Sequence, residues 1–591
     1  MAGLSALEYR GYDSAGLTLL EDGESHSTRA VGPLSALRER VNGAAPAAAR
    51  GIAHTRWATH GRVTEENCHP HADASGRVHV VMNGIVENWT DLKKELVADG
   101  VQFTSETDTE VVAHLIASLY DGDIVAATRA AFGKLRGHYA FVAVHADEPE
   151  VLVGARHECP LVIGVGEGEN FIASAIPAFL ADTRRIQLIE DGEIVVVTPE
   201  GVTFTDLEGN VVEHEIEEVD WDAEAAEKSG YDTFMLKEIH EQPRAVAETV
   251  VDRLAHGTVE LGDIGISDDE LKGLRRVVIV ACGTSYHAGL IGRYAIETWS
   301  RVPVEMDVAS EFRYRDPVID ERDLVIGITQ SGETLDTLAA MRLARQKGAR
   351  VLAVTNIMGS QATRDADGVL YTRAGLEIGV AATKTFVSQV AAMYLFALKL
   401  AQVHDTLEPD RHQALVRDLR DLSHKVEELL GTVDEPVKRM AEHWKQAGFF
   451  LYLGRSAGLA VALEGALKLK EISYVPTDAY AAGEMKHGPI ALLDERTPVV
   501  VSATDSPVLD KVLSNISEVT VRGAHVLAVA TEGSTEVAEH AEEVVYVPRT
   551  DWLLQPLLAV IPLQLLAYYI AQHKGLNVDQ PRNLAKTVTV E

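Results

Sequence analysis

The sequence predicts a multidomain α/β protein, with an N-terminal α+β part followed by two doubly wound parallel α/β domains. At 591 residues the chain is longer than one hydrophobic core supports. Residues 1–220 alternate short β-like runs with loops rich in Gly and His. From residue 269 onward, apolar runs of strand length alternate with helical patterns. That alternation is typical of parallel sheets with helices on both faces.

The composition excludes several classes of partner. Lys and Arg number 54 against 89 Asp and Glu, so the net charge is −35. Such an acidic surface repels nucleic acid and anionic membranes, and we expect neither as a partner. Three widely spaced cysteines make neither a disulfide framework nor a metal site, which favours the cytoplasm. The apolar stretch 553–570 is interrupted by two prolines, so we expect a buried helix there and not a membrane span.

In the N-terminal part, period-2 patterns predict strands and period-3.6 patterns predict helices. Residues 78–82 form a strand that runs into a turn at Asn83-Gly84, a pair suited to positive φ. Further strands are predicted at 161–165, 171–173 and 194–197, and helices at 108–120 and 124–135. From Trp221 the chain is polar and loses its period, and a helix is expected to begin at Thr233.

The C-terminal part contains an internal duplication. The strand patterns at 277–280, 324–328 and 351–354 have counterparts at 449–453, 498–503 and 526–529. A helical pattern follows the first two strands of each set, and residues 410–440 form a helical bridge between the copies. Arg455 stands in the second copy where Thr284 stands in the first. Because the second copy has fewer hydroxyls, we expect an anion site mainly in the first.

Two strand–turn–helix segments of the first copy are rich in hydroxyl groups. The candidate anion-binding residues are Ser285, Thr329, Ser331 and Thr334. Free N–H groups at a helix N-terminus bind anions, although Ser and Thr also cap helices without any ligand. No phosphate-binding loop of the nucleotide type is present, so a small phosphorylated molecule is the expected ligand.

Glu464, Lys468 and Glu471 fall near one face of a helix. A solvated salt-bridge ladder is the ordinary interpretation of such a pattern, but the neighbouring Ala, Leu and Ile residues indicate a buried helix. His487 lies in a glycine-rich loop, where it is either an acid–base group or a surface histidine. Lys586 lies in the polar C-terminal tail.

The N-terminal loops contain side chains suited to an amino acid. Arg56 can pair with a carboxylate and Asp108 with an ammonium group. Asn83 and Gly84 can form an oxyanion hole. The nearby histidines lack the spacing of metal ligands, so we expect no metal.

The chain resembles the glutamine–fructose-6-phosphate aminotransferases (isomerizing), or glucosamine-6-phosphate synthases, over essentially its whole length. The resemblance is carried by Leu7-Glu-Tyr-Arg-Gly-Tyr-Asp-Ser-Ala-Gly16, His54-Thr-Arg-Trp-Ala-Thr-His60, Ser105-Glu-Thr-Asp-Thr-Glu110, Glu311-Phe-Arg-Tyr-Arg315, Lys468-Leu-Lys-Glu-Ile-Ser-Tyr474 and the tail 579–591. These motifs are long and together specific. The family implies synthesis of glucosamine 6-phosphate from fructose 6-phosphate and glutamine, the first step of hexosamine formation, by a cytoplasmic homodimer without cofactor or metal.

The family also implies a domain plan. It comprises a class II glutamine amidotransferase domain of the Ntn-hydrolase fold at 1–220, a linker at 221–268, sugar isomerase (SIS) domains at 269–409 and 441–581 around the bridge 410–440, and an active-site tail at 582–591.

Residue roles follow from the matching positions. The sugar-phosphate cradle is implied at Thr284, Ser285, Gln330, Ser331 and Thr334, and Thr329 stands where the family usually has a serine. Glu471 resembles the base that moves a proton between C1 and C2, and His487 the ring-opening group. Lys586 resembles the lysine that forms an imine with the open-chain ketose, supported by Lys468. The glutamine pocket is implied at Arg56, Thr59, His60, Asn83, Gly84 and Asp108, and the gate of an ammonia channel at Trp57.

One departure is at the start of the chain. The family begins with Cys-Gly-Ile-Val-Gly, whose cysteine is the nucleophile, whereas this sequence begins at Met1 within the following helix. We therefore expect an incomplete amidotransferase domain that releases no ammonia from glutamine in the sequence 1–591. Two alternatives stay open: an ammonia-dependent sugar-phosphate isomerase or aminase, and a non-catalytic hexose-phosphate sensor. The retained Glu471, His487 and Lys586 argue against the sensor.

Overall fold

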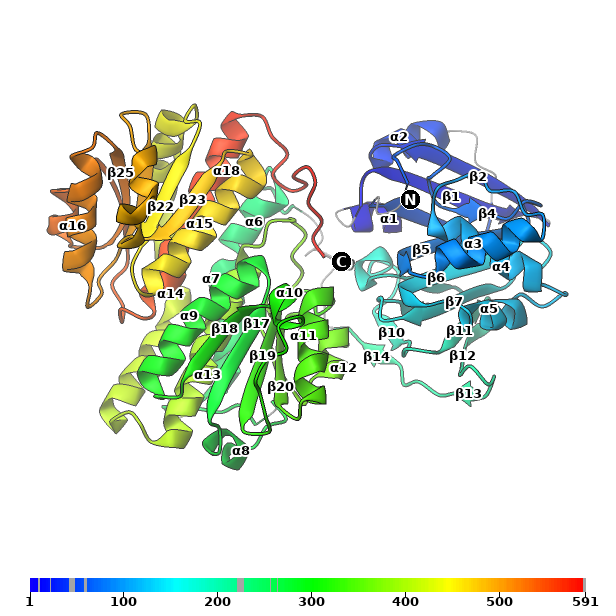
Figure 1. Cartoon of the computed structure of the whole chain (residues 1–591), viewed down its shortest axis with the longest axis horizontal. Coiled ribbons are helices and arrows are strands. Elements are labelled where there is room, and N and C mark those ends of the chain that lie inside the picture. The colour runs from blue at the N-terminus through cyan, green and yellow to red at the C-terminus, as the bar shows by residue number, and fades with distance from the viewer. Residues whose placement is uncertain are drawn as a thin grey trace. The chain divides into compact units, whose positions relative to one another are not determined.

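The computed structural model describes residues 1–8, 11–21, 23–41, 48–57, 61–219, 228–255, 257–262 and 264–587. The chain divides into two compact units. Unit 1 consists of residues 1–226 with 585–591, and unit 2 of residues 227–584. Figure 1 labels many of the elements of both units.

The described residues of unit 1 form three antiparallel sheets. Their strand orders are β2-β1-β3, β14-β10-β8-β9 and β13-β12-β11-β7-β6-β5-β4. The strands are β1 Ser14–Glu21, β2 Glu24–Val31, β3 Arg50–Arg56, β4 His71–Ala72, β5 Val78–Val86, β6 Gly137–His145, β7 Leu152–His157, β8 Val162–Val165, β9 Asn170–Ala173, β10 Arg185–Leu188, β11 Ile194–Thr198, β12 Gly201–Thr205, β13 Val211–Val212 and β14 Glu217–Glu218. The helices are α1 Ala2–Leu7, α2 Leu34–Val41, α3 Trp89–Ala98, α4 Asp108–Leu119, α5 Ile124–Phe132 and the short η2 Ile176–Ala178.

The layers of unit 1 follow from the alternation of its strands. On β5 and β6, Val80 and Phe141 pack with α3, α4 and α5 in one core. Val81 and Val142, which point to the opposite face, pack with residues of β1, β3 and β8 in another. The three-stranded sheet is covered by α1 and α2 on its outer side. Unit 1 is therefore an α+β sandwich with helices outside paired sheets, as predicted.

Unit 2 contains two parallel five-stranded sheets and a short antiparallel hairpin of β15 and β16. The sheet orders are β18-β17-β19-β20-β21 and β23-β22-β24-β25-β26. The strands are β15 Leu254–Ala255, β16 Thr258–Val259, β17 Arg276–Ala281, β18 Val304–Val308, β19 Asp323–Thr329, β20 Arg350–Thr355, β21 Gly368–Tyr371, β22 Phe450–Gly454, β23 Thr477–Ala481, β24 Pro498–Ala503, β25 His525–Thr531 and β26 Glu543–Val547.

Helices cover both faces of each parallel sheet (Figure 1). They are α6 Phe234–His240, α7 Gln242–Val250, α8 Asp268–Lys272, α9 Gly283–Trp299, α10 Ala309–Phe312, α11 Leu335–Gln346, α12 Gln361–Asp365, α13 Lys384–His404, α14 Pro409–Trp444, α15 Ala457–Ser473, α16 Leu509–Thr520, α17 Thr535–Ala538 and α18 Gln555–His573, with short η4 Val251–Arg253, η5 Glu484–His487 and η6 Pro489–Leu492. The shared order of strands, with the first strand inside the sheet, confirms the duplication.

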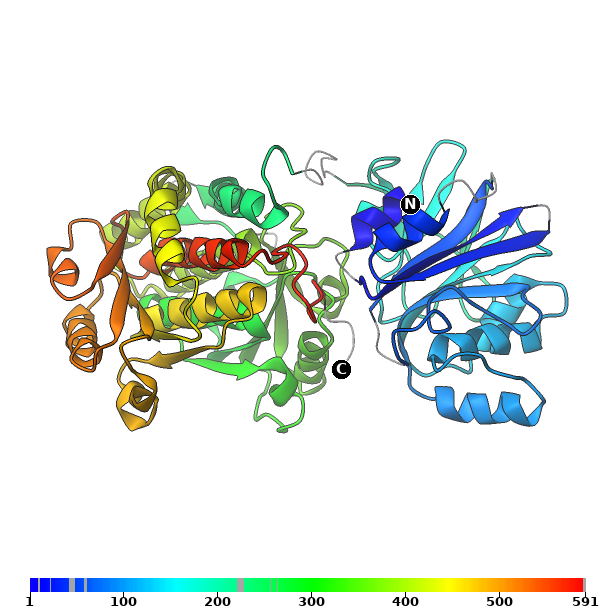
Figure 2. The same cartoon turned by 90° about the horizontal axis from the view of Figure 1, so that it is seen from above.

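Two helices of unit 2, α13 and α18, are long and apolar enough to cross a membrane, but 89% of each apolar window is buried inside the protein. Residues of α13, α14, α15 and α18 share one continuous core, and Figure 2 shows α15 and α18 side by side. The stretch 553–570 is thus a core helix. Thr233 caps α6 by accepting the N–H of Leu236, as predicted.

The turn predicted at Asn83-Gly84 is wrong. Gly84 does have a positive φ of 87°, but both residues lie inside β5, opposite Ala140 and Tyr139 of β6. A side chain at Gly84 would place its Cβ 2.0 Å from the carbonyl oxygen of His138. The glycine therefore serves a close approach of two strands and not a reversal of the chain.

Candidate active site

The hydroxyl-rich turns of the first half of unit 2 lie at one edge of its sheet. β17 and β19 are adjacent and parallel, with Ala281 opposite Ile328. Thr284 and Ser285 begin α9 directly after β17, and Gln330 to Thr334 lead from β19 into α11. Because the carboxyl ends of parallel strands share an edge, the two turns are neighbours, and their helix N-termini favour an anion there.

The hydroxyls at this edge have different surroundings. The Thr329 hydroxyl is buried, accepts the N–H of Gly332 at 3.2 Å and lies 3.0 Å from the Thr334 hydroxyl. The Ser331 hydroxyl accepts the N–H of Glu333 at 3.1 Å, which leaves its own proton for a ligand. Ser285 and Gln330 are half-buried at the same edge. Thr329 thus holds the turn, whereas Ser285, Gln330 and Ser331 line the edge.

A buried ion network joins the two halves of unit 2. On α15, Lys468 Nζ lies 2.6 Å from Glu471 Oε2 and 3.4 Å from Glu464 Oε1. It also donates to the Thr284 hydroxyl of α9 at 3.0 Å. Lys468 and Glu464 are fully buried, while the Glu471 side chain is 20% exposed. Glu471 is therefore the member of the network that a substrate can reach. The Thr284 hydroxyl belongs to this network and not to the open edge.

Neighbouring charges keep the buried groups ionised. Burial by itself would raise the pKa of Glu464, but Lys468 and hydrogen bonds from His287 and Thr284 lower that pKa below its usual value. Burial opposes the charge of Lys468 in the same way, but Glu464 and Glu471 raise its pKa. The network thus holds a fixed ammonium group beside the Glu471 carboxylate.

The C-terminal tail is anchored on unit 2. The Asp579 carboxylate accepts the N–H groups of Phe234 and Met235 at the N-terminus of α6, at 3.0 and 2.8 Å. Near the end of α15, Arg582 stacks on the ring of Tyr474 at 4.2 Å and donates its N–H to the Tyr474 hydroxyl. Lys586 follows four residues later, so its Cα lies within about 14 Å of that of Arg582 by chain geometry.

His487 lies on η5 and is exposed. The hydrogen bonds and ion pairs of the described residues do not link it to Glu471, Lys468 or Thr284. The structure therefore brings together Thr284, Lys468 and Glu471, and leaves His487 on a separate loop.

The candidate glutamine site is built on β3, β5 and α4 of unit 1. Asn83 Oδ1 lies 2.9 Å from His54 Nε2. Because the amide oxygen accepts that bond, the amide N–H₂ of Asn83 is left to face a ligand. Asp108, the first residue of α4, accepts the N–H of Val86 at 2.9 Å, which joins α4 to β5 just beyond Gly84. Asn83, Gly84 and Asp108 are thereby held together.

Arg56 ends β3 and is buried, and burial lowers the pKa of its guanidinium. Its two terminal nitrogens donate to the carbonyl oxygens of Gly61 and Arg62 at 3.3 and 3.4 Å. Trp57 is half-buried and meets the ring of Tyr12 edge to face at 5.7 Å. The predicted residues Thr59 and His60 lie outside the described residues.

Neither cysteine of unit 1 has the surroundings of a nucleophile. Cys68 is fully buried, its thiol donates to the carbonyl oxygen of Thr64 at 3.2 Å, and burial raises its pKa. An activated thiolate needs the opposite shift. Cys159 is also buried. Among the described residues, no group of three His, Cys, Asp or Glu side chains could hold a metal ion.

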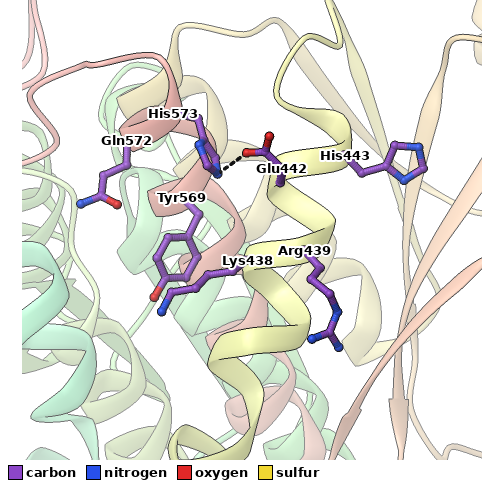
Figure 3. Close-up of a pocket in the computed structure, with 7 residues that line it drawn as sticks. All are labelled: Lys438, Arg439, Glu442, His443, Tyr569, Gln572 and His573. Carbon is purple, nitrogen blue, oxygen red and sulfur yellow. Dashed lines mark ion pairs between the residues drawn. The ribbon is translucent and has the colours of Figure 1, made fainter.

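A cavity of about 530 Å³ lies between α14 and α18. Figure 3 shows its lining residues, Lys438, Arg439, Glu442, His443, Tyr569, Gln572 and His573. His573 pairs with Glu442 at 3.2 Å and Lys438 with Asp434 at 2.6 Å. None of the predicted site residues lines this cavity.

Two histidines at the sites are absent from the sequence-based prediction. His287 contacts Glu464, and His54 contacts Asn83. In the sequence His287 follows the Thr284-Ser285 turn by two residues, but its partner is 177 positions away. The pattern of one helix cannot reveal such a pair.

The comparisons with known proteins agree with this arrangement. A SIS domain model matches residues 270–399 and 445–574, and a glutamine amidotransferase domain model matches residues 54–181. The glutamine–fructose-6-phosphate aminotransferase [isomerizing] of Clostridium tetani is 50% identical over 100% of this chain and 97% of its own length. That of a Thermus thermophilus strain is 52% identical with the same coverage. A solved C-terminal domain of glucosamine-fructose-6-phosphate aminotransferase from Francisella tularensis is 37% identical, covers 60% of this chain and 100% of its own, and superposes with a TM-score of 0.58.

Proposed function

Because the chain belongs to the glutamine–fructose-6-phosphate aminotransferase (isomerizing) family, whose members make glucosamine 6-phosphate from fructose 6-phosphate and glutamine, we propose which of its residues perform each step. The sugar half of the reaction uses the two SIS halves and the C-terminal tail, and glutamine binds in the N-terminal amidotransferase domain. The single observation that carries the proposal is the buried Glu464–Lys468–Glu471 network next to the hydroxyl-rich edge. A protein that only bound sugar phosphates would need the edge but not the network.

The phosphate of fructose 6-phosphate binds at the edge formed after β17 and β19. Ser285, Gln330, Ser331 and Thr334 surround it with neutral donors at two helix N-termini. Thr329 supports the turn through its bonds to Gly332 and Thr334. These neutral donors can hold the phosphate without a lysine or arginine side chain. Because the chain carries a net charge of −35, the phosphate has to be held by such local donors and not by the charge of the protein surface.

Chemistry on the sugar follows at C1 and C2. His487 opens the sugar ring by proton transfer, and the Lys586 amine attacks the C2 carbonyl and expels water to form an imine. Once ammonia has replaced the lysine at C2, Glu471 takes a proton from C1 and returns it to C2. This transfer yields the 2-amino aldose. Lys468, 2.6 Å from Glu471 Oε2, holds this carboxyl group in place for both transfers.

Glutamine binds in unit 1. Its carboxylate pairs with Arg56 and its ammonium group with Asp108, and Thr59 and His60 complete the pocket. The Asn83 amide and the backbone at Gly84 offer hydrogen-bond donors to the carbonyl oxygen of the glutamine side chain. Trp57 stands at the position that the family uses as its ammonia gate.

We also propose that the protein works as a cytoplasmic homodimer. The exposed His487 loop, with Leu492 51% exposed beside it, leaves polar and apolar groups for contact with a second copy. Light scattering after size exclusion tests the dimer, which should have twice the chain mass of 64.1 kDa.

The test of the function is product formation. Purified protein with fructose 6-phosphate and ammonium chloride should yield glucosamine 6-phosphate by mass spectrometry. Glu471→Gln should bind the sugar and yield none. Binding without conversion by the wild-type protein would support a sensor and refute the proposal.

A further inference from the structure

His287 extends the ion network of α15 into the other half of unit 2. It lies on α9, and its Nδ1 is 2.7 Å from Glu464 Oε2. The His287 side chain is 12% exposed and Glu464 is fully buried. Because a carboxylate can only accept in such a contact, His287 Nδ1 carries the proton.

Glu464 has three donors, and only one of them bears a fixed positive charge. Thr284 and His287, both on α9, donate at 3.1 and 2.7 Å, and Lys468 lies at 3.4 Å. The shortest contact of this buried carboxylate is therefore the one from His287. When a buried carboxylate loses one hydrogen-bond donor, its interactions with the remaining donors become stronger.

Lys468 is the group whose position would change if Glu464 lost the hydrogen bond from His287. Its ammonium is shared between Glu464 and Glu471, and the contact with Glu471 is the shorter of the two, at 2.6 Å against 3.4 Å. When His287 satisfies Glu464, Lys468 is free to lie against Glu471. Without His287, Glu464 would draw Lys468 away from Glu471.

We propose that His287 is a positioning residue for the isomerisation step, which acts through Glu464 and Lys468 to fix the position of the Glu471 carboxyl group. The proposal rests on the role of Glu471 proposed above. Helix α9 starts at the phosphate-binding edge, and its residue His287 contacts Glu464 of the ion network. The first SIS half therefore supports proton transfer in addition to binding the phosphate.

The test compares two substitutions of His287 in the conversion of fructose 6-phosphate to glucose 6-phosphate, which needs no glutamine. His287→Leu removes the donor, and kcat should fall roughly 10- to 100-fold because the base is misplaced. KM should stay within about twofold, since the phosphate edge is intact. His287→Asn keeps a donor, and its kcat should stay within about threefold of the wild type.

The matched control is His404→Leu, which makes the same change at a half-buried histidine of α13 that contacts the carbonyl oxygen of Leu271. It should leave kcat unchanged. Thermal melting shows whether each variant folds, and borohydride trapping of fructose 6-phosphate on Lys586 shows whether the sugar still reaches the site. We expect trapping in His287→Leu at the wild-type level.

Two results would overturn the positioning role. One is a wild-type kcat in His287→Leu. The other is an equal loss of kcat in His287→Asn and His287→Leu, which would mean that the imidazole matters for packing alone. A wild-type protein that neither traps nor converts the sugar would instead refute the proposed function of the whole site.

Discussion

Ser331 and Ser506 are equivalent residues in the two halves of unit 2. Each follows the third strand of the duplicated order, and each hydroxyl accepts an N–H two residues further on, at 3.1 and 3.4 Å. Only Ser331 lies beside a second hydroxyl-rich turn. A hydrogen bond to a charged group contributes about 1.5–3 kcal/mol. Ser331→Ala should therefore weaken binding of fructose 6-phosphate about tenfold or more, measured by calorimetry.

Ser506→Ala is the control for that measurement and should leave the affinity unchanged. If both variants bind as tightly as the wild type, the phosphate does not lie at the β17–β19 edge. If Ser506→Ala alone weakens binding, the second half holds the phosphate.

Gly84 should not tolerate a side chain. A Cβ there would lie 2.0 Å from the carbonyl oxygen of His138, at a φ of 87°. Gly84→Ala should lower the unfolding free energy of unit 1 by about 2 kcal/mol or more in urea denaturation. Gly76, whose φ is also positive at 70°, has open space around it, so Gly76→Ala should cost about 1–2 kcal/mol of backbone strain alone. Equal losses for both would show that the close approach does not matter.

The sequence predicts the local conformation of a single residue better than it predicts the strand with which that residue pairs. Asn83-Gly84 has the composition of a turn, and the positive φ that such a pair favours is found at Gly84. What keeps it inside β5 is pairing with β6, more than fifty residues away. Local propensity carries no information about that partner.

At the scale of elements, β3, β4 and the segment between them bring histidines together inside unit 1. The rings of His54 and His69 stack at 4.3 Å, and His71 Nε2 lies 3.0 Å from the hydroxyl of Thr107, which caps the N-terminus of α4. Burial lowers the pKa of His71 from 6.5 to about 3 and places that of His69 well below its usual value. The folded protein therefore keeps both rings neutral.

Unit 1 should lose stability as the pH falls below 6.5. There the unfolded chain binds protons on these histidines and the folded one does not, so each costs about 1.4 kcal/mol per pH unit. For His71 the loss continues down to about pH 3. Denaturation curves between pH 7 and 5 should show the slope, before carboxylates titrate.

His71→Gln should reduce the change of unfolding free energy with pH by the contribution of one histidine. His26→Gln, at an exposed position of β2, should leave this pH dependence as it is. A slope unaffected by His71→Gln would mean that this ring is protonated in the folded protein.

The elements of unit 2 were easier to predict than those of unit 1. Strand–helix alternation fixes a parallel sheet, and the right-handed crossover leaves few alternative orders. The strands of unit 1 pair antiparallel across connections of very different length: β6 pairs with β7 after a short loop and with β5 across three helices, α3, α4 and α5. Alternating patterns identify such strands but do not specify their neighbours.

At the scale of the whole molecule, unit 2 has its own core, which runs through both halves. Residues 228–591 should therefore fold without residues 1–227 and convert fructose 6-phosphate to glucose 6-phosphate. The expected result is one cooperative melting transition and a kcat within about tenfold of the full chain. A fragment that is soluble and folded but inactive would place an essential residue within residues 1–227.

The packing of helices across the two halves of unit 2 explains why only half of the candidate site could be predicted from the sequence. Glu464, Lys468 and Glu471 share one helix, so their spacing alone brings them together. Thr284 and His287 join them only because α9 and α15 pack across the two halves. The place of Lys586 relative to Glu471 depends on the path of the tail, which Asp579 and Arg582 begin to define.

The central claim is that Lys586 and Glu471 act on one sugar in different steps. The most direct measurement is borohydride reduction in the presence of fructose 6-phosphate, followed by peptide mass spectrometry. We predict that the sugar is trapped on Lys586 in the wild type and equally in Glu471→Gln, although the variant converts no fructose 6-phosphate. Trapping on Lys468 or Lys470, or conversion at the wild-type rate by Glu471→Gln, would contradict the account.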